Sequence, residues 1–228
     1  MSDGGWRVIE HEERPGAFHA RPIPDALDRQ VWVSRPTAPA LVLGSAQRDD
    51  VVDRDACARA GFEVVRRRSG GGAVLVVPGQ LVWVDVLLPA GDPLWRDDVG
   101  RAFLWLGEAW QRALAELGVP AAVHDGPMVR TAWSDLVCFA GLGPGELIQR
   151  RADGAAAKVV GISQRRTRAG ARFQCAALLG WDPATLLALL ALDDAARDAA
   201  ATALAGVGAP VDRPAGAVLD ALLGQLPT

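Results

Sequence analysis

The sequence predicts an α+β protein with a central mixed β-sheet and flanking helices. Three observations support this fold class. Short strand-like segments dominate the chain before residue 90, one long helix-like segment follows, and further strand-like segments precede an alanine- and leucine-rich tail. This grouped order differs from the regular alternation of strands and helices that is typical of a doubly wound parallel sheet.

The first part of the chain contains six predicted strands and room for two short helices. Runs of apolar residues between glycine and proline turns predict the strands. They are Trp6–Ile9, Val31–Val33, Leu41–Leu43, Phe62–Arg67, Ala73–Val77 and Leu81–Leu88. Three prolines limit any helix between Pro15 and Asp28 to a short one. A second short helix is predicted at Asp53–Ala60, closed by Gly61.

The longest predicted helix runs from Asp92 to Leu117. Asp92 can cap it, Pro93 suits its first turn, and Gly118 can end it. Four more strands are predicted at Val137–Phe139, Glu146–Gln149, Lys158–Arg165 and Arg172–Leu179. The tail from Asp182 to Leu226 is predicted to be helical, with breaks between Gly206 and Pro214.

Length and composition favour a single domain over residues 1–228, with the helical tail beginning at about residue 182. The net charge of −3 gives no indication of a nucleic-acid partner. Three cysteines without metal or disulfide spacing fit a reducing compartment. The N-terminus lacks the apolar stretch of a secretory signal, and no apolar run is long enough to span a membrane. We therefore expect a cytoplasmic protein without a metal site.

Lys158 is the only lysine in the chain, which otherwise carries its positive charge on arginine. Tyrosine and asparagine are also missing, as expected from a GC-rich genome that replaces lysine wherever function allows. A planar guanidinium cannot mimic the compact ammonium group with its three donors. Lys158 lies in an apolar, strand-like segment, whereas a lysine retained by chance would be expected on a polar helix face. We predict that its ammonium stabilises negative charge on a carbonyl or phosphoryl oxygen.

A run of three glycines joins two of the predicted strands. Gly70, Gly71 and Gly72 follow Arg66-Arg67-Arg68-Ser69 and precede Ala73. A loop without Cβ atoms can bring backbone N–H groups close to a phosphate or carboxylate. It is not a P-loop, because the Gly-Lys-Ser/Thr ending is absent. A plain hairpin turn is the alternative, although two glycines would suffice for one.

Cys138 is the candidate nucleophile. A cysteine between apolar strand neighbours is by default a small buried hydrophobic residue, and it becomes reactive where a nearby cation favours the thiolate. Cys57 and Cys175 are predicted to be structural. The three histidines have no triad or metal spacing and are predicted to be surface or packing residues: His11, His19 and His124.

In combination these segments resemble the biotin/lipoate protein ligase family. Arg66-Arg67-x-Ser69-Gly70-Gly71-Gly72-Ala73-Val74 is similar to the family's lipoyl- and nucleotide-binding loop, and Leu43-Gly44-x-x-Gln47 is similar to a motif upstream of it. Lys158-Val-x-Gly161-x-x-Gln164-x-Arg166 is similar to the segment that carries the family's catalytic lysine. The resemblance runs from about Trp6 to Trp181.

The resemblance implies a class II synthetase-like catalytic domain that attaches lipoate or octanoate to a lysine of a lipoyl domain or of a glycine-cleavage H-type carrier protein. Lys158 and Cys138 are then the catalytic candidates. The implied substrate- and nucleotide-binding residues are Arg66, Arg67, Ser69, Gly70, Gly71, Gly72, Ala73, Gln80, Gly161 and Gln164. The strands at Val74–Val77 and Leu81–Val86 would form the walls of a tunnel for the acyl chain.

Two mechanisms within the family stay open. A ligase makes an acyl-adenylate from a free acid, with ATP and Mg²⁺ as substrate and no permanently bound cofactor. A transferase takes octanoate from a donor such as acyl carrier protein, in some members through an enzyme cysteine. Cys138, followed by Glu146 and Lys158, is similar to the cysteine-dependent octanoyltransferases. Pro78-Gly79-Gln80-Leu81-Val82 is similar to another octanoyltransferase branch, where ligases usually have Gly-Asn.

Two segments depart from the family's pattern. Val76-Val77 replace the histidine-containing pair after the glycine loop, and Cys175-Ala176 replace the His-Gly after the lysine strand. A non-catalytic acyl- or lipoate-binding relative is therefore an alternative. Biotin ligation is a further one, although the Gly-Arg-Gly-type loop of biotin ligases is absent.

Overall fold

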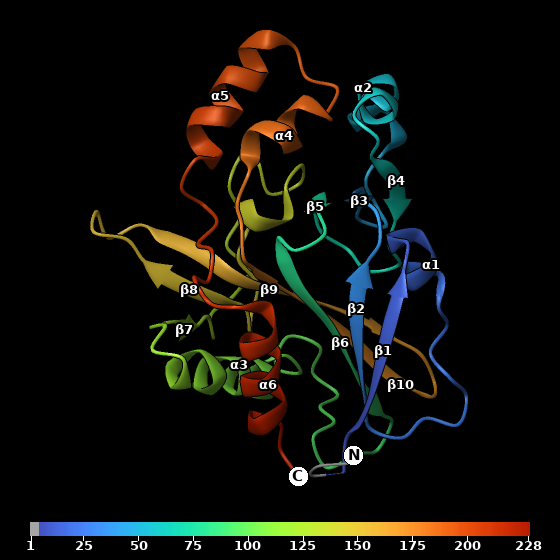
Figure 1. The fold of residues 1–228 in the computed structure, drawn as a ribbon. Helices are drawn as coiled ribbons and strands as arrows, with labels where there is room; N and C mark the ends of the chain where they lie inside the picture. Colours follow the sequence, from blue (N-terminus) through green and yellow to red (C-terminus); the bar gives the residue numbers. More distant parts are fainter. Residues whose placement is uncertain (1–4) are drawn as a thin grey trace.

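A computed structural model describes residues 5–228. A mixed sheet of seven strands forms its centre, a second sheet of three strands lies beside it, and helices cover both (Figure 1). The large sheet contains, in spatial order, β1 (Arg7–Glu13), β2 (Gln30–Pro36), β6 (Leu81–Pro89), β10 (Gly170–Leu178), β9 (Ala156–Arg166), β8 (Leu147–Arg150) and β7 (Ala122–Val123). Only the β1–β2 pair is parallel among these neighbours. The predicted α+β class is confirmed.

The small sheet has β3 (Ala40–Leu43) at its centre, parallel to β4 (Glu63–Arg66) and antiparallel to β5 (Val74–Val76). The loop that contains Gly70–Gly72 joins the two outer strands. Because β3 lies between them, the loop crosses the end of the sheet and is not a hairpin turn. A hydrogen bond from Ser45 N to Ser69 O, 2.9 Å long, fastens it to the residues after β3.

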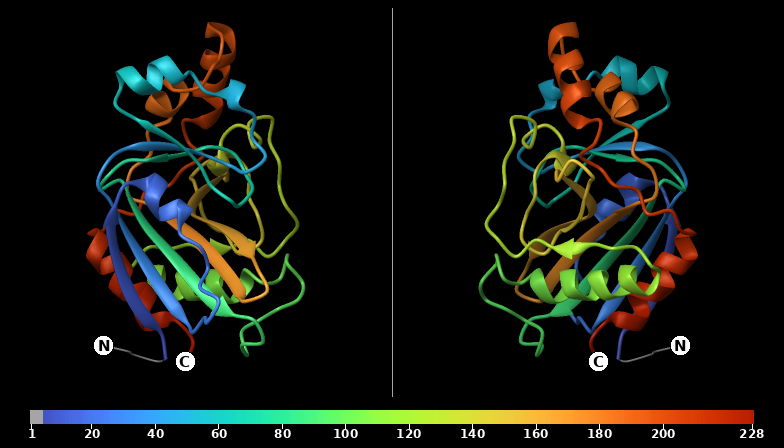
Figure 2. Two further views of the ribbon diagram at one scale, coloured as in Figure 1. Left: turned by 90° about the vertical axis from the view of Figure 1, so that its right-hand side faces the viewer. Right: turned by 90° about the vertical axis from the view of Figure 1, so that its left-hand side faces the viewer.

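The two faces of the large sheet pack against different layers. Residues at alternate positions, such as Val84 and Val86, share a core with α3 (Leu104–Glu116) and α6 (Ala215–Gln225). The intervening residues, such as Trp83 and Leu87, share a second core with α1 (Pro15–Ala20) and the small sheet. This alternation is what a strand buried on both faces requires. Figure 2 shows the sheet between the two layers.

The small sheet is covered by helices on its other side. A third core joins it to α4 (Pro183–Ala188) and α5 (Asp194–Leu204), and includes Cys57 of α2 (Arg54–Arg59). The predicted helical tail with a break before its last helix is confirmed, since α4 and α5 are separated from α6 by an extended segment. That segment has a structural role, because Lys158 N donates to Val207 O at 2.6 Å and Ala209 N donates to Lys158 O at 2.8 Å.

The long helix predicted for Asp92–Leu117 is wrong in its first half, because α3 begins only at Leu104. Asp92 caps a turn instead of a helix: it accepts a hydrogen bond from Leu94 N and pairs with Arg29. Turns continue to residue 103, where Asp98 bonds the Gly100 amide in the manner of an Asx turn. The helix-breaking residues of this segment therefore prevent a helix, although its apolar residues have helical spacing.

The strand predicted for Val137–Phe139 is also wrong. Cys138–Ala140 form a 3₁₀ turn, η2, and only Val137 is extended, where it makes a parallel bridge with Ala73. A further 3₁₀ turn, η1, spans Asp49–Val51. The turn at Cys138 bends the chain away from the sheet, which leaves the thiol half-buried at a surface instead of enclosed between strands.

Across residues 5–228, no helix combines the length and apolarity needed to cross a membrane. Within the same residues, no group of three or more His, Cys, Asp or Glu side chains is placed to hold a metal ion.

Candidate active site

An apolar cavity lies between the two sheets. It holds about 480 Å³ of empty space, part of which is open to solvent. Val74 and Val76 of β5 face it from one side, and Leu81 and Trp83 of β6 face it from the other. These are the two segments that were expected to form the walls of an acyl tunnel.

A second hollow, larger and more polar, lies next to this cavity. It holds about 1520 Å³ of empty space and is lined by Gly70–Gly72, Glu146, Lys158 and Gln164. Three residues line both hollows: Cys138, Ile162 and Ser163. Cys138 therefore lies where the apolar cavity meets the open cleft, and it is the only one of the three with a nucleophilic thiol.

The Lys158 ammonium is buried at the cleft, with 3% of the side chain exposed. Its Nζ lies 2.8 Å from Glu146 Oε2 and donates to Cys138 O at 2.9 Å. The Phe139 ring lies 5.3 Å from Nζ, within the range of a cation–π contact. Lys158 thus lines the same cleft as the glycine loop.

Glu146, which the sequence analysis named only as part of the resemblance around Cys138 and Lys158, is a further part of the site. Its side chain accepts hydrogen bonds from Gly143 N at 2.6 Å and from Ile162 N at 3.1 Å. These bonds fix the carboxylate against Lys158. A signal did exist, because a lysine in an apolar strand requires a buried acid nearby, but the sequence alone does not say which acid.

The glycine loop is shaped by close backbone contacts. Gly71 has φ +98°, a conformation that favours glycine. A Cβ on Gly72 would lie 2.6 Å from the backbone of Val137, and a Cβ on Gly44 would lie 1.8 Å from Gly71 O. In contrast, a Cβ on Gly70 would meet no atom within 4 Å. Two of the three glycines are therefore required by packing or conformation.

Hydrogen bonds join the glycine loop to the segment that carries the thiol. Ala73 N donates to Leu136 O at 2.8 Å, and Cys138 N donates to Ala73 O at 3.0 Å. These bonds explain how two segments more than 60 residues apart meet at the site. The loop and the thiol therefore form one structural unit.

Arg67 supports the glycine loop from the cavity side. Its guanidinium donates to Gly70 O and Gly72 O, each at 2.8 Å, and to Val42 O at 3.3 Å. No carboxylate among residues 5–228 pairs with it, so its charge is balanced only by carbonyl dipoles. Its Nη2 and Cys138 Sγ lie 2.9 Å and 3.5 Å from the point that a Gly71 Cβ would occupy. The guanidinium and the thiol are thus neighbours.

The remaining predicted site residues fall into two groups. Gly161 lines the cavity, and Gln164 lines the cleft with both amide atoms buried and without a partner among the described residues. Ser69 is buried and bonds Ser163 Oγ at 3.0 Å. Ser69 lines neither hollow, and the same holds for three others: Arg66, Ala73 and Gln80. Arg66 bonds Gly44 O and Asp49, whereas Ala73 and Gln80 line a separate depression beside Trp181.

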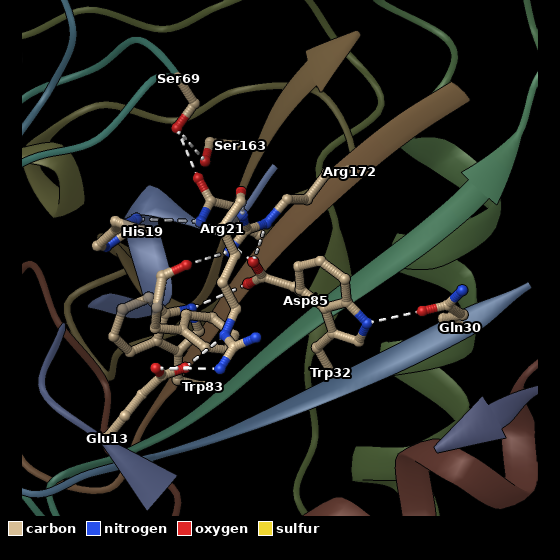
Figure 3. Close-up of polar contacts among 12 residues, drawn as sticks. Glu13, His19, Arg21, Gln30, Trp32, Ser69, Trp83, Asp85, Ser163 and Arg172 are labelled. Carbon is tan, nitrogen blue, oxygen red and sulfur yellow. Dashed lines mark hydrogen bonds and ion pairs between the residues drawn. The ribbon is translucent and has the colours of Figure 1, made fainter. Parts of the chain in front are cut away.

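A buried polar network lies behind the cavity (Figure 3). Asp85 of β6 is fully buried and accepts from Arg172 Nε, from Trp83 Nε1 at 2.9 Å and from Gln174 Nε2 at 3.2 Å. Burial raises the pKa of Asp85, and the Arg172 guanidinium opposes that rise. Since the carboxyl group contacts three donors, we treat it as ionised. The lone acid in the apolar run of β6 was the sequence signal for this network.

The other two cysteines are structural, as expected. Burial raises the pKa of the Cys175 thiol far above its ordinary value, and burial also raises the pKa of Cys57. His19 packs on the Trp83 ring, which agrees with the expected packing role, and it also lines the apolar cavity. His11 packs against Phe18 and Trp32, which agrees with a packing role.

The chain belongs to the lipoyl protein ligase A/B catalytic domain family, whose model matches residues 24–213. The fold agrees with solved structures of that family. No curated protein matches the chain.

Three solved structures illustrate the likeness of the fold. A bipartite lipoate protein ligase from Thermoplasma acidophilum, described with its E2 lipoyl domain, has a TM-score of 0.73 and 20% identity, over 99% of this chain and 82% of that one. A putative lipoate protein ligase from T. acidophilum with bound lipoic acid has a TM-score of 0.70 and 18% identity, over 98% and 84%. A lipoate-protein ligase A bound with ATP has a TM-score of 0.67 and 18% identity, over 98% and 84%.

Proposed function

We propose that this protein attaches a lipoyl or octanoyl group to a lysine of a lipoyl-carrier domain, with Cys138 as the nucleophile that receives the acyl group. The position of the thiol carries the proposal. Cys138 lies at the one junction where an apolar cavity suited to an acyl chain meets an open cleft suited to a carrier. Similar solved structures, one of a putative ligase with bound lipoic acid and one of a ligase described with its E2 lipoyl domain, support the substrate class.

The thioester route consists of two exchanges at Cys138. The sulfur attacks the carbonyl carbon of an acyl thioester, the new S–C bond forms, the donor's C–S bond breaks, and the proton of Cys138 passes to the leaving thiol. The amine of the carrier lysine then attacks the enzyme thioester. An amide bond forms, and one amine proton returns to the sulfur of Cys138.

Lys158 would bind the acyl oxygen in either exchange. Contacts with the described residues use two of its three N–H donors, those to Glu146 and to Cys138 O. The third can donate to a carbonyl oxygen that gains negative charge during the attack. A fixed donor in a site that excludes water stabilises such charge strongly.

An acyl-adenylate route is the second candidate. It is favoured by Gln164, which lines the open cleft and whose buried amide has no partner among the described residues, and by the similar ligase bound with ATP. In this route Lys158 would stabilise the acyl-phosphate oxygens. Mg²⁺ would then be held mainly by the nucleotide phosphates, as is usual for this ion.

The carrier and the donor follow from the same proposal. The acceptor is a lipoyl domain or a glycine-cleavage H-type protein, and the donor of a thioester is a carrier such as acyl carrier protein. We place the reaction in the cytoplasm, because that is where reduced thiols persist.

The direct test is an intact-mass assay of the acceptor. An apo lipoyl domain is incubated with the protein and either octanoyl–acyl carrier protein or lipoate with Mg-ATP. We expect a mass gain of one octanoyl group in the first reaction. No mass gain in either reaction, with a folded protein that binds octanoate, would instead support a non-catalytic acyl-binding relative.

Cys138→Ser separates the two routes. It should abolish transfer from the thioester donor, whereas an adenylating enzyme would keep most of its ATP-dependent activity. Cys57→Ser is the matched control, since that thiol is buried in another core.

A further inference from the structure

His19 reaches the apolar cavity from α1. Its imidazole is 8% exposed and packs on the Trp83 ring, with the ring centres 4.6 Å apart. Unlike Cys138, it does not line the open cleft. His19 therefore belongs to the inner part of the cavity, where the acyl chain of the proposed function would lie.

The hydrogen-bond network fixes the tautomer of His19. Asp85 only accepts hydrogen bonds, so the Gln174 group 3.2 Å from it is the amide NH₂. Ser69 Oγ then donates to Gln174 Oε1 at 3.1 Å, which agrees with this orientation. The second amide hydrogen points to His19 Nδ1, also 3.2 Å away. Nδ1 is consequently an acceptor, and the proton is on Nε2.

The imidazole is neutral. Burial, followed by the positive charges of Arg172 and Arg67, lowers the pKa of His19 to about 3. Figure 3 shows the ring next to this network. A neutral ring with Nδ1 occupied offers one polar function to the cavity, a single N–H donor.

That donor has no protein partner among residues 5–228, and Nε2 keeps contact with open space. The nearby walls are Val76, Leu81 and Trp83, which offer no acceptor. Water can satisfy the donor while the cavity is free. A plain alkyl chain that displaces the water leaves the donor unpaired, whereas a chain with an acceptor atom replaces the lost bond.

We infer that His19 is a specificity-determining residue, whose Nε2–H selects acyl chains that carry a hydrogen-bond acceptor along their length over unsubstituted alkyl chains. A keto or hydroxyl oxygen is a stronger acceptor for this donor than a sulfur atom. The inference rests on the proposed function only in taking the cavity as the acyl site. Among the medium-chain acyl groups that the proposed function admits, it names polar-substituted chains as the preferred ones.

The test is calorimetric binding of free acids to the full-length protein. Octanoate is compared with oxo-octanoates in which the keto group is moved stepwise along the distal half of the chain. We expect the wild type to prefer one of the oxo acids. His19→Phe, which keeps the ring stacked on Trp83, should lower this preference about tenfold. His11→Phe, in the same aromatic cluster but outside the cavity, should leave it unchanged.

An unchanged preference in His19→Phe would overturn the inference, as would a wild type that prefers octanoate to every oxo acid. If His19→Phe does not fold, the ¹⁵N shift of Nε2 in the wild type decides: it should move with the oxo acid and stay with octanoate. The outcomes for the two proposals differ. If the acids bind with the expected preference for an oxo acid but no acyl transfer occurs, only the proposed function is contradicted. If transfer occurs but wild type and His19→Phe show the same preference, only the role of His19 is contradicted. If neither acid binds at millimolar concentration, both proposals are contradicted.

Discussion

The Lys158 ammonium and the Glu146 carboxylate form an ion pair 2.8 Å long in which neither side chain is more than 7% exposed. The backbone amides of Gly143 and Ile162 donate hydrogen bonds to the carboxylate. Glu146 therefore fixes the direction of the ammonium, which lines the open cleft together with the glycine loop. The pair stabilises the fold only while both partners are present, because a single buried charge is costly.

Glu146→Gln should strongly destabilise the protein. It leaves the Lys158 ammonium buried without a counter-charge, which typically costs about 3–5 kcal/mol. Urea unfolding at neutral pH measures the loss. Asp135→Asn is the matched control, since its pair with Arg130 is exposed and should contribute little. Equal stability of wild type and Glu146→Gln would contradict a buried charged pair.

Lys158→Arg should remove transfer activity. A planar guanidinium does not fit the space between Glu146 and Cys138 O that the compact ammonium occupies. The loss of one oriented donor predicts a decrease in kcat of about 10²–10³. The acceptor mass assay measures it, and Arg150→Lys on the neighbouring strand β8 tests whether any Lys/Arg exchange has this effect. Full activity of Lys158→Arg would refute the role assigned to the ammonium.

Gly72→Ala and Gly70→Ala form a matched pair within one loop. A Cβ on Gly72 would lie 2.6 Å from the backbone of Val137, so the loop and the Cys138 segment must separate. A Cβ on Gly70 would meet no atom within 4 Å. We expect a lower melting temperature for Gly72→Ala and little change for Gly70→Ala. The same decrease in both variants would argue against this loop geometry.

The stability of the protein should depend on His19 at acidic pH. The pKa of His19 is about 3 in the folded protein, below its ordinary value of 6.5, so the unfolded chain binds a proton that the folded one excludes. This contribution is complete above pH 6.5 and decreases as the pH falls toward 3. Between pH 6.5 and 4 it amounts to about 3 kcal/mol.

His19→Phe removes that contribution. As the pH falls from 7 to 4, the wild type should therefore lose unfolding free energy that His19→Phe does not lose. Urea titrations of both proteins at several pH values measure the difference. A constant difference over this range would mean that the imidazole is not held neutral.

The order of elements could be predicted because local patterns determine it. Apolar runs predicted the strands of both sheets except the two-residue β7, which sequence reasoning missed. The isolated Lys158 and the three glycines pointed to the site. Asp92–Leu117 was predicted as one helix because its apolar spacing is helical. Instead, Asp92 pairs with Arg29 and Asp98 bonds the Gly100 amide, and the segment forms turns. The spacing of apolar residues does not reveal such distant or competing bonds.

The junction at Cys138 could not be predicted from the sequence. It depends on the bridge between Ala73 and Val137 and on the turn at Cys138–Ala140, which join segments far apart in the chain. The contribution of His19 was hidden for the same reason. Its role follows from Gln174 on β10 and Asp85 on β6, which set its tautomer and lie far from it in the chain.

The central claim is that Cys138 accepts an acyl group from a thioester. The most direct measurement is the intact mass of the protein after brief exposure to an octanoyl thioester without acceptor. We predict the addition of one octanoyl group, located on Cys138 by peptide mapping, and no addition in Cys138→Ser. An unmodified protein that still acylates a lipoyl domain, and does so only with ATP, would contradict the claim.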